Sequence, residues 1–335
     1  MIPVVFEEWS DNVWRITTHA KEEINTCYLL DCGEEITLID SGLNERVGKE
    51  IFRAIDAMGR KASDLTNVFF THSHPELLGG LRLVKELCPD VKIHIHSNSK
   101  PVFEEGKNYV LAKQFPLESS GGKLSLAWKT PIFENFKDLP KPDVYLQGGE
   151  DFRIADETLI IQHSGGHSSD SIIIHAYNAK VTFIGDELGL YNNNEYSFFF
   201  DLTGSPDRRS KALRAVQKLK SNYILSSHIS PIENEFVDEE VEAAILAQQH
   251  FETTLQETLL GFDESRLDTI VNHVYGALSI DWKTPYSELK VDFSTIMKYL
   301  ELWQSKELVL FNEKTKKYSY NREKLSEDYD PYAPY

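Results

Sequence analysis

The stretch THSHPELLGG at residues 71–80 places His72, His74 and Glu76 directly after the apolar run NVFF. Imidazole and carboxylate side chains are ligands that zinc, iron and manganese share. A loop that follows a strand is free of the strand's strict two-sided alternation, so it can turn several side chains toward one point. The stretch therefore predicts a metal site, although the next residue, Leu77, offers no ligand atom.

Four other segments end a β-rich run with residues of the same chemical types. They are LIDSG with Asp40, HSGGH with His163 and His167, FIGDELG with Asp186, and SSHIS with His228. Glycines beside these residues allow the backbone to approach a site closely, because glycine has no Cβ atom. These strand ends predict one shared site, provided that the fold brings them together.

The first two thirds of the chain alternate short β-rich runs with helical stretches. Strands are expected where β-branched and aromatic residues gather, at 34–40, 66–70, 91–96, 158–163, 171–177, 180–186 and 222–228. Helices are expected where apolar residues recur at three- and four-residue spacing, at 45–59, 79–87 and 206–220. The elements predict an α/β domain that carries its reactive side chains at strand ends.

After His228 the pattern becomes helical. A long acidic helix is expected from about 233 to 260, two more helices at 266–278 and 293–308, and a β-hairpin at 308–321. Three helices and a hairpin have the outline of a winged helix. We therefore expect a first domain at 1–232, a helical linker and winged-helix-like domain at 233–325, and a flexible tail at 326–335.

The order and spacing of the motifs resemble the metallo-β-lactamase superfamily from about residue 24 to 230. The signature of that family is a HxHxDH loop, a later histidine flanked by glycine, a bridging aspartate in a GD turn, and a final histidine. The resemblance, and not the strand count, implies an αββα sandwich. It also implies two divalent metal ions, either zinc or iron, with manganese as a further option.

Carried over by position, the resemblance implies six metal ligands. Three histidines would hold the first ion, a glutamate and a histidine the second, and an aspartate would bridge them. The ligands of the first ion would be His72, His74 and His167, those of the second Glu76 and His228, and the bridging residue Asp186. The carboxylates Asp186 and Glu76 are also the expected catalytic residues.

Two further positions match the family in supporting roles. Asp40 matches the acidic residue beneath the site, which orients ligands and does not bind the metal. His163 matches the first histidine of the HxxGH turn, which is usually structural.

The chain departs from the signature twice. Glu76 stands where aspartate is usual, and Leu77 stands where the hydrolases place a histidine of the second site. A second site without that histidine should bind a metal more weakly, or should suit metals that accept more oxygen ligands, such as iron or manganese. The flavodiiron branch of the superfamily is similar in this respect, although it usually has glutamate where this chain has His74.

The resemblance implies a metal-dependent hydrolase, in which a metal-bound water attacks an ester, thioester or phosphoester. The alternative is a non-haem diiron protein that binds or reduces dioxygen, without the flavodoxin domain of the flavodiiron proteins. A third interpretation is a regulatory protein with an inactive site and a DNA-binding winged helix. Residues 256–325 carry ten basic and eleven acidic side chains, however, so a basic recognition face is missing.

Several other polar or aromatic residues have a plain structural interpretation. His94 and His96 share one strand face and could chelate, but the preferred interpretation is a hydrogen-bonded pair on an edge strand. Glu187 and Tyr191 could line a pocket or belong to a polar loop. The aromatic run YSFFFDL at 196–202 could form the wall of a cleft or pack in a core.

Composition narrows the class of protein. The 335 residues are 41% hydrophobic and 26% charged, with a net charge of −18, which disfavours nucleic acid and anionic membranes as partners. Three cysteines without a CxxC pair, an acidic start and no long apolar run predict a cytoplasmic protein that does not enter a membrane. We expect a small-molecule substrate, and a C-terminal domain that serves as a lid or as the contact of a homodimer.

Overall fold

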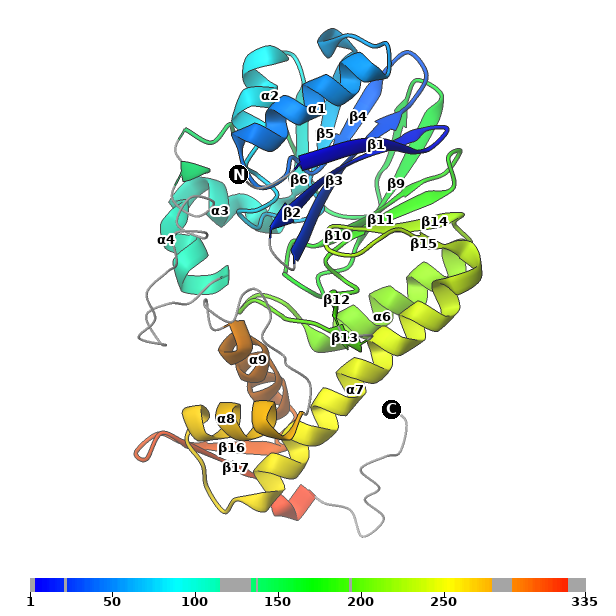
Figure 1. Cartoon of the computed structure of the whole chain (residues 1–335). Helices are drawn as coiled ribbons and strands as arrows, with labels where there is room; N and C mark the ends of the chain where they lie inside the picture. The colour runs from blue at the N-terminus through cyan, green and yellow to red at the C-terminus, as the bar shows by residue number, and fades with distance from the viewer. Residues whose placement is uncertain are drawn as a thin grey trace.

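The computed structural model describes residues 4–20, 23–114, 134–136, 138–192, 195–278 and 291–324. Two β-sheets face each other and helices cover their outer faces, so the first part of the chain is an αββα sandwich (Figure 1). This architecture confirms the expected fold class. The tail predicted at 326–335 lies outside the described residues.

The first sheet has seven strands in sequence order, antiparallel from β1 to β4 and parallel from β4 to β7. Its first three strands form an antiparallel ribbon that the sequence had not predicted. The strands are β1 (Val4–Ser10), β2 (Val13–Ala20), β3 (Glu23–Asp31), β4 (Ile36–Ile39), β5 (Leu65–Phe69), β6 (Lys92–His96) and β7 (Val144–Leu146).

The second sheet has six strands in the order β15-β14-β11-β10-β9-β8. β10 is buried over its whole length, because it lies inside the sheet and both faces are covered. The strands are β8 (Asp151–Ile154), β9 (Glu157–His163), β10 (Ile172–Ala176), β11 (Val181–Gly185), β14 (Tyr223–Ser226) and β15 (Ile232–Glu233), and a separate ribbon joins β12 (Leu190–Asn192) to β13 (Glu195–Ser197).

Helices bury their apolar sides on the two outer faces. Asn44 begins the first long helix, since its side chain accepts hydrogen bonds from the backbone N–H groups of Arg46 and Val47. The helices of the first face are α1 (Glu45–Ala57), α2 (Leu81–Leu87) and α3 (Lys100–Glu105), followed along the chain by α4 (Lys107–Tyr109) and a π-helix (Val110–Gln114). The second face is covered by α6 (Pro206–Val216) and the first half of α7 (Val237–Gly261).

The interior between the sheets is apolar, and it holds the strand ends in place. Tyr28 of the first sheet packs on Phe183 of the second, with ring centroids 5.4 Å apart. β4 and β5 run parallel, and β9, β11 and β14 share one direction, because β9 and β11 both pair antiparallel with β10. The carboxyl ends of the strands that precede the predicted motifs therefore gather on one edge of each sheet.

α7 leads from the sandwich to a small C-terminal group of elements at the bottom of Figure 1. They are α8 (Leu267–Ala277), α9 (Val291–Ser305), β16 (Val309–Asn312) and β17 (Lys317–Tyr320), the order expected from the sequence. Their core also includes two aromatic side chains of the sandwich, Phe198 and Phe200. The domain boundary at residue 232 and the winged-helix character of this part stay predictions.

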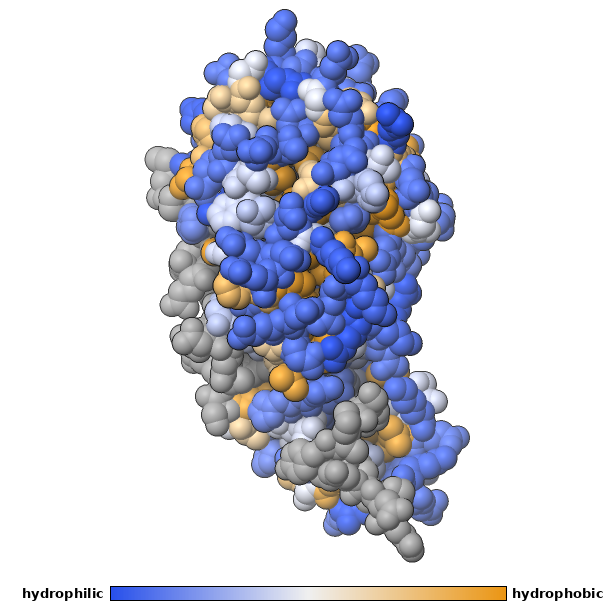
Figure 2. Space-filling view, turned by 90° about the vertical axis from the view of Figure 1, so that its right-hand side faces the viewer, coloured by the Kyte–Doolittle hydropathy of each residue, from blue (hydrophilic) through white to orange (hydrophobic). Residues whose placement is uncertain are grey.

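The face turned toward the viewer in Figure 2 is mostly hydrophilic, and its hydrophobic side chains lie scattered among charged and polar ones. None of the helices within the described ranges is both long enough and apolar enough to cross a membrane.

Candidate metal centre

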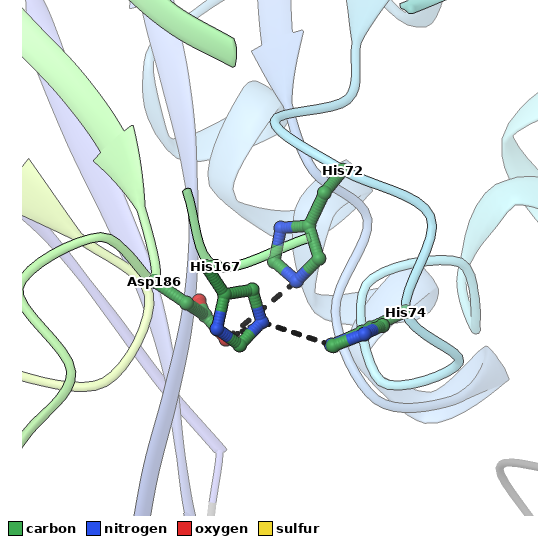
Figure 3. Close-up of side chains that lie close together, drawn as sticks. All are labelled: His72, His74, His167 and Asp186. Atoms are coloured by element: carbon green, nitrogen blue, oxygen red, sulfur yellow. Dashed lines mark hydrogen bonds and ion pairs between the residues drawn. The ribbon is translucent and has the colours of Figure 1, made fainter. Parts of the chain in front are cut away.

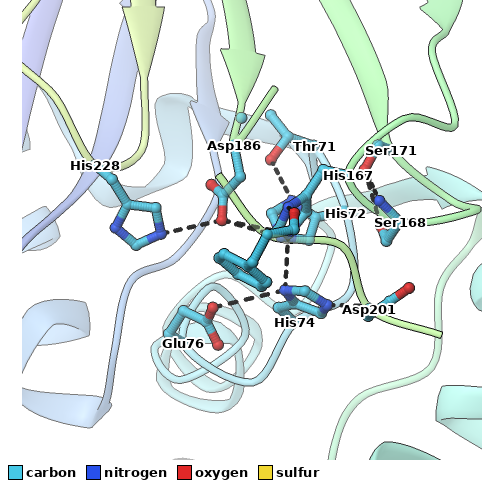
Figure 4. A network of polar contacts seen from close by, with 12 residues as sticks. Thr71, His72, His74, Glu76, His167, Ser168, Ser171, Asp186, Asp201 and His228 are labelled. Atoms are coloured by element: carbon cyan, nitrogen blue, oxygen red, sulfur yellow. Dashed lines mark hydrogen bonds and ion pairs between the residues drawn. The ribbon is translucent and has the colours of Figure 1, made fainter. Parts of the chain in front are cut away.

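The structure brings all six predicted ligands together at the edge where the strands end. Two groups of side chains offer ligand atoms within 4.8 Å of one another, and they share Asp186. Figure 3 shows the first group, and Figure 4 adds the second. The first group is His72, His74, His167 and Asp186, and the second is Glu76, Asp186 and His228.

The ligands come from both sheets. His72, His74 and Glu76 follow β5 of the first sheet, whereas His167, Asp186 and His228 follow strands of the second. Every one of the six is at most 7% exposed. Residues separated by more than 150 positions in the chain therefore meet in one buried cluster.

The separations within the cluster suit a common cation. Two nitrogen ligands at about 2.1 Å from a tetrahedral zinc ion lie about 3.4 Å apart. The Nδ1 atom of His74 lies 3.1 Å from Nε2 of His167. The Oδ2 atom of Asp186 lies 3.5 Å from Nε2 of His167 and 3.6 Å from Nε2 of His72.

The second group is organised around the same carboxylate oxygen. Nε2 of His228 lies 3.0 Å from Oδ2 of Asp186, and Oε1 of Glu76 lies 3.7 Å from Nδ1 of His74. Asp186 thus belongs to both groups, and its role as a bridging ligand stays a prediction.

Some buried ligand atoms lack a hydrogen-bond partner within the described part of the chain, among them Nε2 of His72 and Oδ1 of Asp186. An unpaired buried polar atom is costly, and a cation would satisfy both. The residues therefore fit the metal ions that the sequence implies.

Asp40 lies beneath the cluster and acts on His72 through Thr71. Its carboxylate accepts hydrogen bonds from the Thr71 backbone N–H and hydroxyl, both at 2.9 Å, and Thr71 Oγ1 lies 3.2 Å from Nδ1 of His72. The backbone of Asp40 has a φ of 60°, in the left-handed region that non-glycine residues rarely adopt. Asp40 therefore contacts His72 only through Thr71, and its role in orienting that ligand stays a prediction.

Gly185, at the end of β11, allows the two sheet edges to come this close. A Cβ atom at this position would lie 2.8 Å from the Oγ1 atom of Thr71, and its φ of +52° favours glycine in any case.

Asp201 orients the second histidine, and sequence reasoning missed it. Its Oδ2 atom lies 3.1 Å from Nε2 of His74, while Oδ1 accepts from the backbone N–H of Thr203 and Gly204. With Nε2 hydrogen-bonded to a carboxylate, Nδ1 of His74 is left to face the cluster. A carboxylate that fixes a histidine in this way also raises its basicity as a ligand.

Backbone carbonyls orient the other two histidines in the same manner. Nδ1 of His167 donates to the carbonyl of Phe199 at 3.1 Å, and Nδ1 of His228 donates to the carbonyl of Ile24 at 2.8 Å. In both rings Nε2 is therefore the atom that faces Asp186. All four histidines present one defined nitrogen to the cluster.

Glu187 supports the backbone of the third ligand and does not line the pocket. It is fully buried and accepts hydrogen bonds from the backbone N–H groups of Gly166 and His167. Arg209 holds the loop that follows Asp186, because its guanidinium donates to the backbone carbonyls of Glu187 and Leu188. These contacts could not be predicted from the sequence alone.

Burial and neighbouring carboxylates divide the histidines into two kinds. Burial lowers the pKa of His167 to about 4 and the pKa of His72 well below its usual value, so both rings are neutral at pH 7. Burial also disfavours charge on His74 and His228, but their carboxylate partners outweigh it and raise each pKa to about 9.

The two carboxylates of the cluster have pKa values that are shifted in opposite directions. Burial raises the pKa of Glu76. Burial acts in the same direction on Asp186, but the charge of His228 and its hydrogen bond outweigh it and hold the pKa of Asp186 well below its usual range. Asp186 is therefore ionised at pH 7.

Leu77 belongs to the hydrophobic core and not to the cluster. Its side chain is fully buried among the residues that join the first sheet to α1 and α2. The backbone carbonyl of Leu77 accepts from the N–H and hydroxyl of Ser41, which fixes the loop that carries His74 and Glu76. The position that holds a histidine in the hydrolases has a packing role here.

The remaining histidines of the motifs are structural. His163 hydrogen-bonds to the carbonyl of Ser169 at 2.8 Å and stacks on His96 at 3.8 Å. His94 stacks on Phe69 at 4.1 Å. The expectation of an edge strand was wrong, however, because β6 lies between β5 and β7.

The aromatic run at 196–202 packs largely in cores, although its first residue, Tyr196, also lines a cavity. Phe198 and Phe200 pack in the C-terminal core, whereas the ring of Phe199 lies 4.5 Å from that of His167. Tyr191 is 46% exposed and lines a cavity of about 420 Å³, together with His228.

Comparisons with known proteins agree with this geometry. The family model described as the metallo-beta-lactamase superfamily matches residues 20–228. Comparison with curated proteins found no match.

Among solved structures, a metallo-beta-lactamase family protein from Thermus thermophilus superposes with a TM-score of 0.71 at 16% identity, covering 94% of this chain and 100% of that one. A beta-lactamase domain protein from Burkholderia ambifaria gives a TM-score of 0.68 at 16% identity, covering 94% and 93%. A metallo-beta-lactamase from Pontibacter korlensis gives 0.53 at 16% identity, covering 72% and 99%. At these identities the likeness shows the fold, and with the family match it follows that the chain belongs to the metallo-β-lactamase superfamily.

Proposed function

We propose that the protein is a metal-dependent hydrolase that cleaves an ester, thioester or phosphoester. The observation that carries the proposal is the buried set of three histidines and one aspartate, whose ligand atoms all lie within 4.8 Å of one another. Three imidazoles and a carboxylate are the donor set of a zinc-type site, and the orphaned atoms of His72 and Asp186 support it.

In this proposal His72, His74 and His167 hold one ion, and Asp186 bridges it to a second. Glu76 and His228 complete the second site. Divalent cations bound there would activate water and polarise the scissile oxygen of the substrate.

The protein itself orients the ligand side chains and excludes water from them. Asp201, Thr71 and two backbone carbonyls fix the four imidazole rings, so little reorganisation is needed when an ion binds. Burial of all six ligands excludes bulk water from the cluster, which strengthens each electrostatic contact.

The cavity beside His228 is our candidate for the place where a substrate group lies. Its walls include Tyr191, Tyr196 and Phe236, and its acidic groups are the carboxylates of Glu233 and Glu240. No lysine or arginine lines it within the described ranges. This lining favours a neutral or cationic group over an anionic one.

A second candidate is a non-haem diiron protein that binds or reduces dioxygen. It is favoured by the second group of ligands, which contains two carboxylates and one imidazole, because Leu77 is committed to the core. Oxygen-rich sites suit iron and manganese better than a histidine-rich site does.

The location and assembly of the protein are further proposals. The three cysteines, Cys27, Cys32 and Cys88, are buried and unpaired, which supports the reducing cytoplasm. A homodimer built on the C-terminal elements is testable by light scattering of the eluting peak, which would give twice the mass of the 38.4 kDa chain.

Protein purified without added metal is the material for the test. Elemental analysis gives its zinc, iron and manganese content, and turnover is measured with 4-nitrophenyl acetate, acetylthiocholine and bis(4-nitrophenyl) phosphate. We expect zinc-supported turnover that is lost in Asp186→Ala. An iron-loaded protein that develops a visible absorption band in air, and hydrolyses none of the three, would support the diiron alternative.

A further inference from the structure

We propose that α9, in the C-terminal part of the chain, positions two of the metal-ligating histidines by holding residues 198–202 in place. The inference rests on the proposed metal centre. It gives the C-terminal elements a direct role in that centre, which differs from the lid, dimer contact or DNA-binding element considered above.

Residues 198–202 contact two parts of the protein with alternating side chains. Successive side chains of an extended segment point to opposite sides. Phe198 and Phe200 enter the C-terminal core, where their rings lie 5.5 Å and 6.0 Å from those of Phe251 and Tyr299, respectively. The side chain between them, Phe199, packs in the core of the first sheet instead.

On the opposite side the segment contacts two ligands directly. The carboxylate of Asp201 lies 3.1 Å from Nε2 of His74, and the carbonyl of Phe199 accepts from Nδ1 of His167 at 3.1 Å. The backbone N–H of Asp201 also donates to the carbonyl of His167 at 3.3 Å. The position of this short segment therefore sets the orientation of both rings.

α9 holds the segment at the residue between these two contacts. The hydroxyl of Ser294 donates to the carbonyl of Phe200 at 2.6 Å, and the hydroxyl of Thr295 accepts from its N–H at 3.1 Å. Both hydroxyl side chains belong to residues that are at most 1% exposed, so water does not reach them. One turn further along, the Lys298 ammonium donates to the carbonyl of Leu202 at 3.0 Å.

These contacts form a short physical connection from the helix to the ligands. Ser294 and Thr295 satisfy both backbone groups of Phe200, and the residues on either side of Phe200 contact His167 and His74. A shift of α9 moves the peptide of Phe200 and, with it, the two partners of the imidazole rings. Loss of such outer partners weakens metal binding without removing a ligand.

The test compares Ser294→Ala/Thr295→Val with wild-type protein, using zinc alone as the probe and a chromophoric chelator as competitor. We expect the double variant to bind zinc about tenfold more weakly, because Ser294 and Thr295 hold the segment that contacts the ligands and do not contact the ligands themselves. Thr295→Ser, which keeps a hydroxyl, should restore most of the affinity when it replaces Thr295→Val in the pair. Lys298→Met is a milder variant, to be used if the double variant does not fold.

The matched control is Tyr320→Phe. It removes a buried hydrogen bond of the same C-terminal core, from Gln256 Nε2 to Tyr320 Oη at 2.8 Å, and leaves residues 294–298 unchanged. Equal zinc affinity of the double variant, the control and wild type would overturn the inference while leaving the proposed function intact.

A wild-type protein that binds no zinc would instead overturn the proposed function. Hydrogen exchange of the backbone amides of 201–204 then tests the connection on metal-free protein. Faster exchange in the double variant than in Tyr320→Phe supports the inference, and equal exchange overturns it.

Discussion

Replacing Asp201 by asparagine should impair metal binding although Asp201 is not a ligand. The asparagine oxygen can keep the hydrogen bonds that Oδ1 now accepts from Thr203 and Gly204. The amide nitrogen then takes the place of Oδ2 and faces Nε2 of His74, so two donors meet. His74 can relieve the conflict only by moving its proton to Nδ1, the atom that faces the cluster.

The structure sets the size of the effect. The bond that is lost joins a buried carboxylate to a buried imidazole at 3.1 Å. A hydrogen bond to a charged group contributes about 1.5–3 kcal/mol. Since 1.4 kcal/mol is a factor of ten, zinc should bind Asp201→Asn about 10- to 100-fold more weakly.

Competition with a chromophoric chelator measures the zinc affinity, and thermal unfolding of the metal-free protein reports any general loss of stability. Asp143→Asn is a suitable control, because Asp143 accepts from the backbone N–H of Ile93 in β6 and is not a partner of the ligand histidines. A zinc affinity of Asp201→Asn within twofold of wild type would refute the argument that this carboxylate selects the tautomer of His74.

Three other predictions follow from the same contacts. His74→Ala should lose at least one equivalent of bound metal by elemental analysis, because it removes an imidazole from the first group. Leu77→Ala should lower the free energy of unfolding by about 2–5 kcal/mol in urea titration, with unchanged metal content, since Leu77 fills a core. Burial lowers the pKa of His94 to about 4, whereas the unfolded chain protonates near its ordinary value of about 6.5. Acid therefore favours the unfolded chain, and wild type should lose up to about 3 kcal/mol of stability between pH 6.5 and 4 that His94→Phe does not lose.

The ligands could be predicted from the sequence because each follows a recognisable strand. β5, β9, β11 and β14 end in the motifs that carry His72, His167, Asp186 and His228. The β-branched residues of these strands are buried on both faces or on one, so local composition reports the strand directly. The spacing of the motifs then identified the family.

The partners of the ligands could not be predicted in this way. Asp201 meets His74 across 127 residues, and His228 meets the carbonyl of Ile24 across 204. Only the arrangement of the two sheets makes these contacts, and a lone aspartate or a backbone carbonyl carries no local pattern. The ribbon β1–β3 was missed for a related reason, because β1 carries exposed acidic residues such as Glu8 among its apolar ones.

Because the ligands are divided between the two sheets, an ion bound at their common edge would fasten the two halves of the sandwich to each other. His72 and Glu76 would be drawn toward Asp186 and His228, and separating the layers would require the ion to leave. Ion affinity and the apolar contacts between the layers, such as Tyr28 against Phe183, would then be thermodynamically linked. A substitution deep in the sandwich, distant from any imidazole, would change how tightly the ion is held.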